Sequence, residues 1–185
     1  MSFKNTKLDN INCRVMRISF TGELSYEINI ESKYGKSLWE KCISVGQEFN
    51  ITPYGTETMH LLRAEKGYII VGQDTDGSIT PLDLGLDWMI GKSKKDFLGK
   101  RSLIRSDTVR KDRKQLVGIL PTNKNEKLEE GQHIILDKEI KTPTPMLGHI
   151  TSCYQSPTLG HNFALAVSKM VSHLLELKHL HQLLN

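Results

Sequence analysis

The sequence lacks the long apolar runs of membrane and secreted proteins. Its longest apolar stretches are only a few residues, far below the ~20 that a membrane-spanning helix needs. The opening MSFKNTKLDNINCR has no apolar segment of the kind found in signal peptides. We therefore expect a soluble protein of the cytoplasm.

Cysteine and histidine patterns of metal sites are also missing. Cys13, Cys42 and Cys153 are widely spaced and form no CxxC pair, so neither a disulfide framework nor a zinc knuckle is indicated. No two histidines flank a Glu at helical spacing, and His179 and His181 would lie on different faces of a helix. The sequence predicts structural or incidental thiols and no metal site.

Most familiar catalytic motifs are absent. There is no glycine-rich dinucleotide fingerprint, phosphate-binding loop, zinc-protease motif or GxSxG elbow. DTDG, starting at Asp74, is similar to the start of a calcium loop, but the position of the required Glu is Gly85. Asp74 and Asp76 are predicted to be turn residues. With no nucleophile beside a base, the residues indicate a binding module rather than a complete active site.

The patterns that are present indicate an α+β fold for the first part of the chain. The 185 residues, 38% hydrophobic and 25% charged, suffice for one core or two small ones. We predict an antiparallel hairpin over 13–31 turning at Thr21–Gly22, and helices over 34–49 and 56–66, the second stopped by Gly67. Strands over 68–71 and 84–90 and a short helix over 96–105 follow. This order predicts an antiparallel sheet covered by helices.

The composition and the predicted secondary structure of the chain change near residue 105. Residues 92–114 hold ten Lys and Arg against three Asp. Short strands predicted over 115–121, 133–137, 146–154 and 164–169 are typical of a small β-barrel or sandwich. We therefore predict domains over 1–106 and 107–170. For residues 171–185 we predict an atypical, leucine-rich helical tail, which we expect to come from a frameshift or truncation of a longer gene.

The segment SFTGELSYEINI holds the first candidate site residue. Read as a strand, it places Leu24, Tyr26, Ile28 and Ile30 on one face and Glu27 on the polar face. Arg63 lies in LLRAEKG near the end of the second predicted helix. A carboxylate can accept two N–H groups of an aminopyrimidine, and a guanidinium can pair bidentately with an anion. Composition alone favours plain solvated side chains at both positions.

Four ordered blocks resemble a known family. They are SFTGELSYEINI, LLRAEKGYIIVGQDTDGSITPLDLGLDWMIGK, KDFLGKRSL and GHITSCYQSPTLG. Over residues 13–169 they resemble the aminomethyltransferase-like (glycine cleavage T-protein) folate-binding family and, more closely, the C-terminal part of the alpha subunits of heterotetrameric sarcosine oxidases. The resemblance implies the second half of a T-protein-like fold, with a ferredoxin-like layer to about residue 105 and then a small C-terminal β-barrel.

The same resemblance implies the site residues. Glu27 would hold the pteridine ring of tetrahydrofolate, and Phe20, Tyr26 and Arg63 would line the folate pocket. Phe20 stands where aminomethyltransferases usually carry Tyr. The Ala-Arg-Asp triplet of those enzymes reads Thr-Met-His at 58–60 here, which argues against a plain T-protein.

The resemblance implies a fragment of an oxidoreductase. The region would trap the one-carbon unit from sarcosine demethylation as 5,10-methylenetetrahydrofolate, within a hetero-oligomer of sarcosine oxidase subunits. Flavins and NAD would bind elsewhere in that complex. The family's catalytic Asp precedes this segment, so we expect no catalytic residue here and an inactive isolated chain.

Two other functions stay open from the sequence. One is a fragment of a tetrahydrofolate-dependent aminomethyltransferase or demethylase, and the other is a non-catalytic T-protein-like interaction module. The basic run 92–114 would contact a polyglutamate tail or the flavin subunit, or would be a solvated linker. Neither nucleic acid nor membrane is expected as a partner.

Overall fold

The structure is a computed structural model and describes residues 1–136 and 142–169. The chain divides into two compact units, Met1–Arg63 and the residues from Ala64 onward. The sequence predicts a domain boundary near residue 107 instead, and that boundary stays a prediction.

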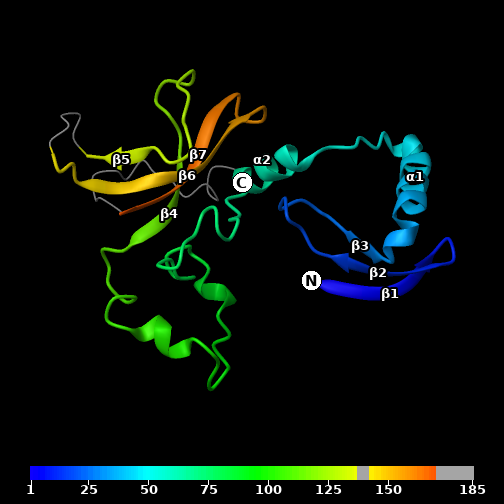
Figure 1. Cartoon of the computed structure of the whole chain (residues 1–185), viewed down its shortest axis with the longest axis horizontal. Helices are drawn as coiled ribbons and strands as arrows, with labels where there is room; N and C mark the ends of the chain where they lie inside the picture. Colours follow the sequence, from blue (N-terminus) through cyan, green and yellow to red (C-terminus); the bar gives the residue numbers. More distant parts are fainter. Residues whose placement is uncertain (137–141, 170–185) are drawn as a thin grey trace. The chain divides into compact units, whose positions relative to one another are not determined.

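The first unit contains a three-stranded antiparallel sheet in the order β1-β2-β3 (Figure 1). Its strands are β1 (Ser2–Leu8), β2 (Ile11–Arg17) and β3 (Glu27–Ile30). Asp9 and Asn10 join β1 to β2 with φ values of 47° and 67°. Two successive positive φ values are typical of the tight turns that match strand twist in hairpins, and Asp and Asn tolerate them well.

The hairpin predicted over 13–31 is confirmed only in its pairing. Cys13 does lie opposite Ile30, and Gly22 has the positive φ expected of a turn, 84°. However, residues 18–26 are irregular and β3 begins only at Glu27. The prediction that Leu24 and Tyr26 belong to the core face is also wrong, because their side chains are 67% and 61% exposed.

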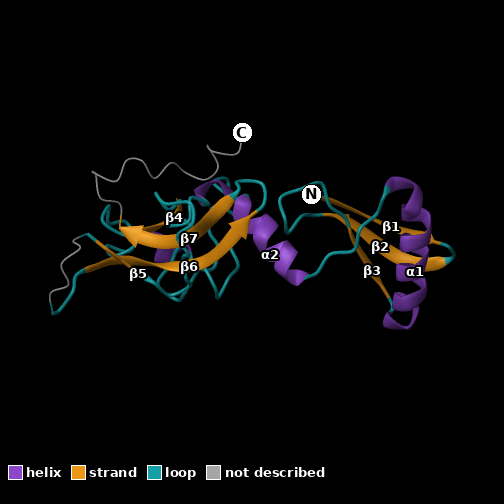
Figure 2. Ribbon diagram, turned by 90° about the horizontal axis from the view of Figure 1, so that it is seen from above, coloured by secondary structure: helices purple, strands orange, loops and turns teal. Residues whose placement is uncertain are grey.

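Helix α1 (Gly35–Gly46) covers one face of this sheet (Figure 2). Short 3-10 turns, η1 (Ser32–Tyr34) and η2 (Gln47–Phe49), flank it, so the helix predicted over 34–49 is confirmed. Leu38, Cys42 and Val45 of α1 share a cavity with Ile11 of β2, which identifies the sheet face toward the helix. Gly46 allows close packing of Ile51, because a Cβ there would lie 2.6 Å from the Ile51 side chain.

Helix α2 (Thr56–Glu65) is confirmed at the predicted place. Gly67 follows it with a φ of 69°, and its backbone N–H donates to the carbonyl of Ala64 at 2.9 Å. A left-handed residue just after a helix is most easily supplied by glycine.

The second unit contains a four-stranded antiparallel sheet in the order β4-β7-β6-β5 (Figure 1). The strands are β4 (Lys114–Ile119), β5 (His133–Ile135), β6 (Met146–Ser156) and β7 (His161–Lys169). They confirm the four strands predicted after residue 114. Val117, Ile150, Ala164 and Ala166 form a buried core cluster on this sheet.

Residues 66–113 contain no strand, so the strands predicted over 68–71 and 84–90 are wrong. In their place are loops and two 3-10 turns, η3 (Asp87–Met89) and η4 (Lys100–Ile104). The second turn confirms a short helical element within 96–105. The tail predicted over 171–185 lies outside the described residues.

Candidate functional site

Glu27 begins strand β3 on the sheet face that points away from α1. It lies directly opposite Met16 of β2, and residues directly opposite share a face. Because side chains alternate along a strand, Met16 lies on the face opposite that of Ile11, which packs toward α1. The sequence therefore placed Glu27 on the non-core face as the structure does.

The Glu27 carboxylate is fixed by its neighbour on the same face. The side-chain amide of Asn29 donates to Oε1 of Glu27 at 2.7 Å, and both side chains are exposed. Within residues 1–136 and 142–169, the other Glu27 oxygen accepts no hydrogen bond. It is therefore available to a ligand that carries N–H donors.

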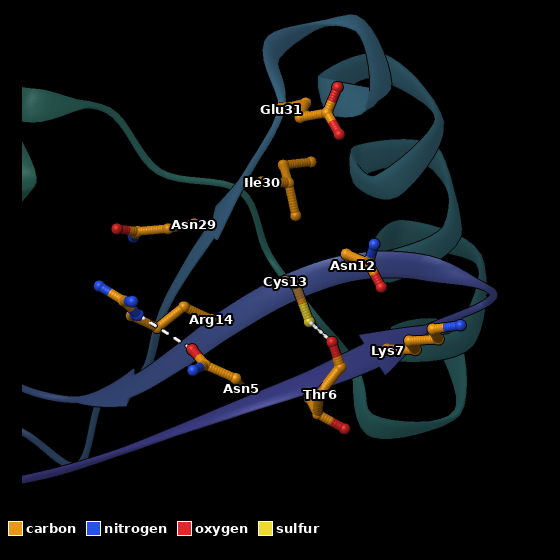
Figure 3. A pocket seen from close by; sticks show the side chains of 9 residues that line it. All are labelled: Asn5, Thr6, Lys7, Asn12, Cys13, Arg14, Asn29, Ile30 and Glu31. Carbon is orange, nitrogen blue, oxygen red and sulfur yellow. Dashed lines mark hydrogen bonds between the residues drawn. The ribbon is translucent and has the colours of Figure 1, made fainter.

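Beyond Met16 and Phe3, which lie in the row of Glu27, this face is formed by amides and cations. Arg14 lies opposite both Asn29 and Asn5, its Nε donates to Oδ1 of Asn5 at 3.0 Å, and its guanidinium lies 5.4 Å from the centre of the Phe3 ring. Figure 3 shows Arg14 and Asn5 side by side across β1 and β2. We call Asn5, Lys7, Asn12, Arg14, Glu27 and Asn29 the polar sheet face.

An open cavity of about 790 Å³ lies along the polar sheet face. Figure 3 shows its lining side chains, among them Asn29 and Arg14. Glu27 itself does not line it but lies two residues before Asn29 on the same strand. The face therefore continues from an acceptor at Glu27 to the cations Arg14 and Lys7.

Phe20 lies in the irregular segment before β3 and contacts helix α2. Its ring is 44% exposed, and its centre lies 6.2 Å from that of His60. His60 and Arg63 are three residues apart on α2, so they share one face of the helix. The structure thus brings Phe20 to the helix face that carries Arg63. It also identifies His60 as a residue that packs against Phe20.

Arg63 and Tyr26 are placed differently from what a shared pocket requires. The Arg63 side chain is fully buried, so its guanidinium does not lie on the surface. Tyr26 directly precedes Glu27, and its side chain lines a separate cavity of about 340 Å³ with Val15 and Arg17. The structure brings Glu27 and Asn29 together, and Phe20 and His60, but not all four predicted site residues.

The sequence reasoning missed the polar sheet face beyond Glu27. Strand β1 was not predicted, because SFKNTKL has few apolar residues. It also lacks an apolar alternation of period two, since Lys4 and Thr6 on the face of Leu8 are polar, so no local signal could have found it.

Asp74 anchors a loop of the second unit to strand β6. It is 1% exposed, and Oδ1 accepts from the hydroxyls of Thr151 at 2.5 Å and Ser152 at 3.0 Å. Its Oδ2 accepts from the Ile70 backbone N–H at 2.9 Å. The backbone bond confirms the turn role predicted from the sequence, while the two hydroxyl contacts make Asp74 a structural anchor.

Neither metal ligands nor membrane helices are found in the described part of the chain. No group of three or more His, Cys, Asp or Glu is arranged there to hold a metal ion. No helix that the structure describes is long and apolar enough to cross a membrane.

Comparison with known protein families gives two matches, one after the other along the chain. Residues 1–94 match the GCVT N-terminal domain, and residues 114–178 match the glycine cleavage T-protein C-terminal barrel domain. Among solved structures, the aminomethyltransferase T of the glycine cleavage system from Bartonella henselae aligns with a TM-score of 0.70 at 22% identity, over 85% of this chain and 42% of that one. That likeness establishes a T-protein-like fold.

Individual relatives fall into two groups. The chain is 55% identical over 91% of its length to the sarcosine oxidase subunit alpha of Corynebacterium sp. (strain P-1), and 38% identical over 83% to that of Rhizobium meliloti. It is 34% identical over 88% to the aminomethyltransferase of Thermoanaerobacter pseudethanolicus. The chain spans only 18%, 15% and 42% of these three relatives. On the evidence of the two domain matches and the shared fold, the chain belongs to the glycine cleavage T-protein family.

Proposed function

We propose that the first unit binds a reduced folate, tetrahydrofolate, through Glu27. The observation that carries the proposal is the arrangement of the Glu27 carboxylate on the polar sheet face. Asn29 fixes one oxygen at 2.7 Å, and the other is free to accept from the N–H groups of an aminopyrimidine ring. Such a charge-assisted contact suits the pterin part of a folate.

The neighbouring residues differ in how directly they would contact the folate. Phe20 offers an exposed ring as a packing surface for the pterin. Arg63 is fully buried, so we assign it a supporting place behind the pocket wall rather than direct contact. Tyr26 is a folate-pocket residue on the strength of the family resemblance alone, since it lies on the opposite face from Glu27.

We further propose that this region belongs to a sarcosine oxidase alpha subunit. It would hold the folate that takes up the one-carbon unit of sarcosine as 5,10-methylenetetrahydrofolate. The support is the identity of 55% to such a subunit, against 34% to an aminomethyltransferase. A bound reduced folate would supply the accepting nitrogens, while this chain's side chains orient the ring and provide no catalytic group.

The proposal extends to the partners, the cofactors and the cellular location of the complex. The partners would be the other subunits of a hetero-oligomeric oxidase, the flavin and NAD would bind in those parts, and the complex would lie in the cytoplasm. The isolated chain is expected to show no sarcosine turnover.

Two other functions compete with this proposal. A fragment of a folate-dependent aminomethyltransferase would use the same Glu27 site without a flavin partner, and the aminomethyltransferase relatives favour it. A T-protein-like interaction module would keep the fold and bind no folate.

Calorimetric titration of the full chain with tetrahydrofolate tests the Glu27 site. Charge-assisted hydrogen bonds contribute about 1.5–3 kcal/mol, so Glu27→Gln should weaken binding about tenfold or more. Glu40→Gln is the matched control, since Glu40 lies on α1, away from the polar sheet face, and pairs with Lys36 at 3.7 Å on the surface. Equal affinity of wild type and Glu27→Gln would contradict the site, and absence of binding in both would favour the interaction module.

A further inference from the structure

An apolar groove of about 670 Å³ lies in the loops of the second unit. Its lining includes Val71, Leu84, Leu86, Met89, Leu98 and Leu103. None of the apolar side chains of residues 69–104 belongs to the buried core, and Val71 and Leu98 are 83% and 104% exposed. Large exposed apolar patches on soluble proteins mark places where another surface binds.

The chain segment that contributes Lys94, Phe97, Leu98 and Leu103 to the groove is strongly basic. Between residues 92 and 105 there are six cations, Lys92, Lys94, Lys95, Lys100, Arg101 and Arg105, which we call the basic rim, and one acid, Asp96. Within the described ranges none of the six forms an ion pair, while Asp96 accepts from the backbone N–H of Phe97 at 3.0 Å. Lys94 lines the groove itself.

Two of the next four basic residues in the chain are neutralised. Arg110 pairs with Asp107 at 3.3 Å and with Asp112 at 3.1 Å, and Arg113 pairs with Asp83 and Asp107. Lys111 and Lys114 form no ion pair within the described ranges. Most of the unpaired positive charge of residues 92–114 therefore lies on the basic rim, which also holds the exposed Leu98.

The groove lining carries a single acidic residue, Asp76. Its carboxylate accepts from the hydroxyl and the backbone N–H of Ser78, at 2.6 and 2.7 Å. The Asp76 charge is therefore already engaged by its own turn, whereas Lys94 and the other cations of the basic rim have no acidic partner in the described part of the chain.

We propose that the apolar groove and the basic rim bind an acidic amphipathic segment of a partner protein. The apolar side chains of the segment would fill the groove, and its carboxylates would lie over Lys94 and the other rim cations. A solvated linker would explain the lysines but not the exposed side chains of Val71, Met89 and Leu98 along the groove. The proposal does not depend on folate binding, because all its residues lie in the second unit.

A synthetic helical peptide tests this surface on the full chain. It carries Leu on one face at helical spacing and Glu at the remaining positions, and a matched peptide carries Lys in place of Glu. Trp88 is 71% exposed and adjoins Met89, so its fluorescence reports binding in a Trp39→Phe background. We expect the Glu peptide to bind and to weaken as salt rises from about 0.05 to about 0.5 M, and the Lys peptide to bind far less.

Paired variants separate the two parts of the surface. The double variant Lys94→Glu, Arg101→Glu should weaken the Glu peptide on the order of tenfold, from two reversed surface charges. Leu98→Ser should weaken it by a similar factor, and its exposure makes unfolding of the variant no concern. Lys124→Glu and Phe49→Ser are the controls, being a lysine and an exposed ring outside the groove.

Several results would overturn the proposal. They are equal binding of the Lys and Glu peptides, no binding of either, and peptide binding that the rim variants leave unchanged. Binding of phosphatidylserine vesicles without peptide binding would assign the surface to anionic lipid. A change of Trp88 emission on deletion of residues 170–185 would assign the groove to the chain's own tail. A dimer in sedimentation, abolished by Leu98→Ser, would assign it to a second copy.

Discussion

The guanidinium of Arg113 binds both carboxylate oxygens of Asp83, thirty residues earlier in the chain. Nε donates to Oδ1 at 2.8 Å, and Nη2 donates to Oδ2 at 2.7 Å. The side chains are only 11% and 4% exposed. Arg113 also donates to the carbonyl of Ser78 and to Asp107, so it ties the loop around residue 80 to the segment that leads into β4.

Arg113→Ala should destabilise the second unit by about 3 kcal/mol, because removing one partner of a buried pair leaves the other charge uncompensated. Arg113→Lys should recover only part of this, since an ammonium cannot make the two parallel bonds. Urea unfolding followed by circular dichroism measures both. Arg110→Ala is the control, because its ion pairs are exposed and should contribute less than about 1 kcal/mol. Equal losses for Arg110→Ala and Arg113→Ala would contradict this reasoning.

The Asp83 carboxylate should also give stability a pH dependence. Burial raises the pKa of Asp83, but the hydrogen bonds from Arg113 and Thr80 outweigh it, so its pKa lies below the ordinary value. The unfolded chain then binds a proton at higher pH than the folded one. The stabilisation is therefore complete above about pH 4, the ordinary pKa of Asp, and is lost as pH falls through the lower folded value.

Asp83→Asn is expected to remove this contribution. The variant should be less stable than wild type at pH 7, and the difference should shrink as the pH is lowered below about 4. Urea midpoints across that range measure it. A difference that stays constant with pH would mean that the Asp83 charge does not contribute to stability.

Gly148 allows strands β6 and β7 to approach closely. A Cβ at this position would lie 2.0 Å from the Val167 carbonyl oxygen and 2.6 Å from the Ser168 Cα. Since both are backbone atoms, Gly148→Ala should force the strands apart. We expect it to lower the free energy of unfolding by several kcal/mol, as overpacking a core does. Gly77→Ala is the control, because open space surrounds its Cβ position. Similar thermal midpoints for the two variants would contradict the close approach.

The elements that the sequence predicted well are those with a complete local signal. Helix α2 has its apolar spacing and Gly67, and β7 has the short apolar run FALAV after the turn at 157–160. The strand predicted over 68–71 failed because a short apolar run does not distinguish a strand from an exposed loop. Its residues Ile69 and Val71 instead line the apolar groove, a role that depends on tertiary structure.

The candidate site was predictable at Glu27 and not beyond it. The alternation in YEINI placed Glu27 and Asn29 on one face, because strand period alone determines that. Arg14 and Asn5 join them through the register of three strands, which no local pattern specifies when β1 is itself polar. The burial of Arg63 likewise follows from packing and not from the sequence around it.

Asn29 is a positioning residue for Glu27 in the proposed folate site. Asn29→Leu should leave the free energy of unfolding within about 0.5 kcal/mol of wild type, because the side chain is on the surface. It should weaken tetrahydrofolate binding about fivefold, since the net value of one hydrogen bond is about 1 kcal/mol. Asn125→Leu is the control, as Asn125 is an exposed asparagine of the second unit. Calorimetry of the double variant Glu27→Gln, Asn29→Leu decides the mechanism. If Asn29 acts through Glu27, it has no further effect once Glu27 is changed, whereas additive losses would mean that Asn29 contacts the ligand independently.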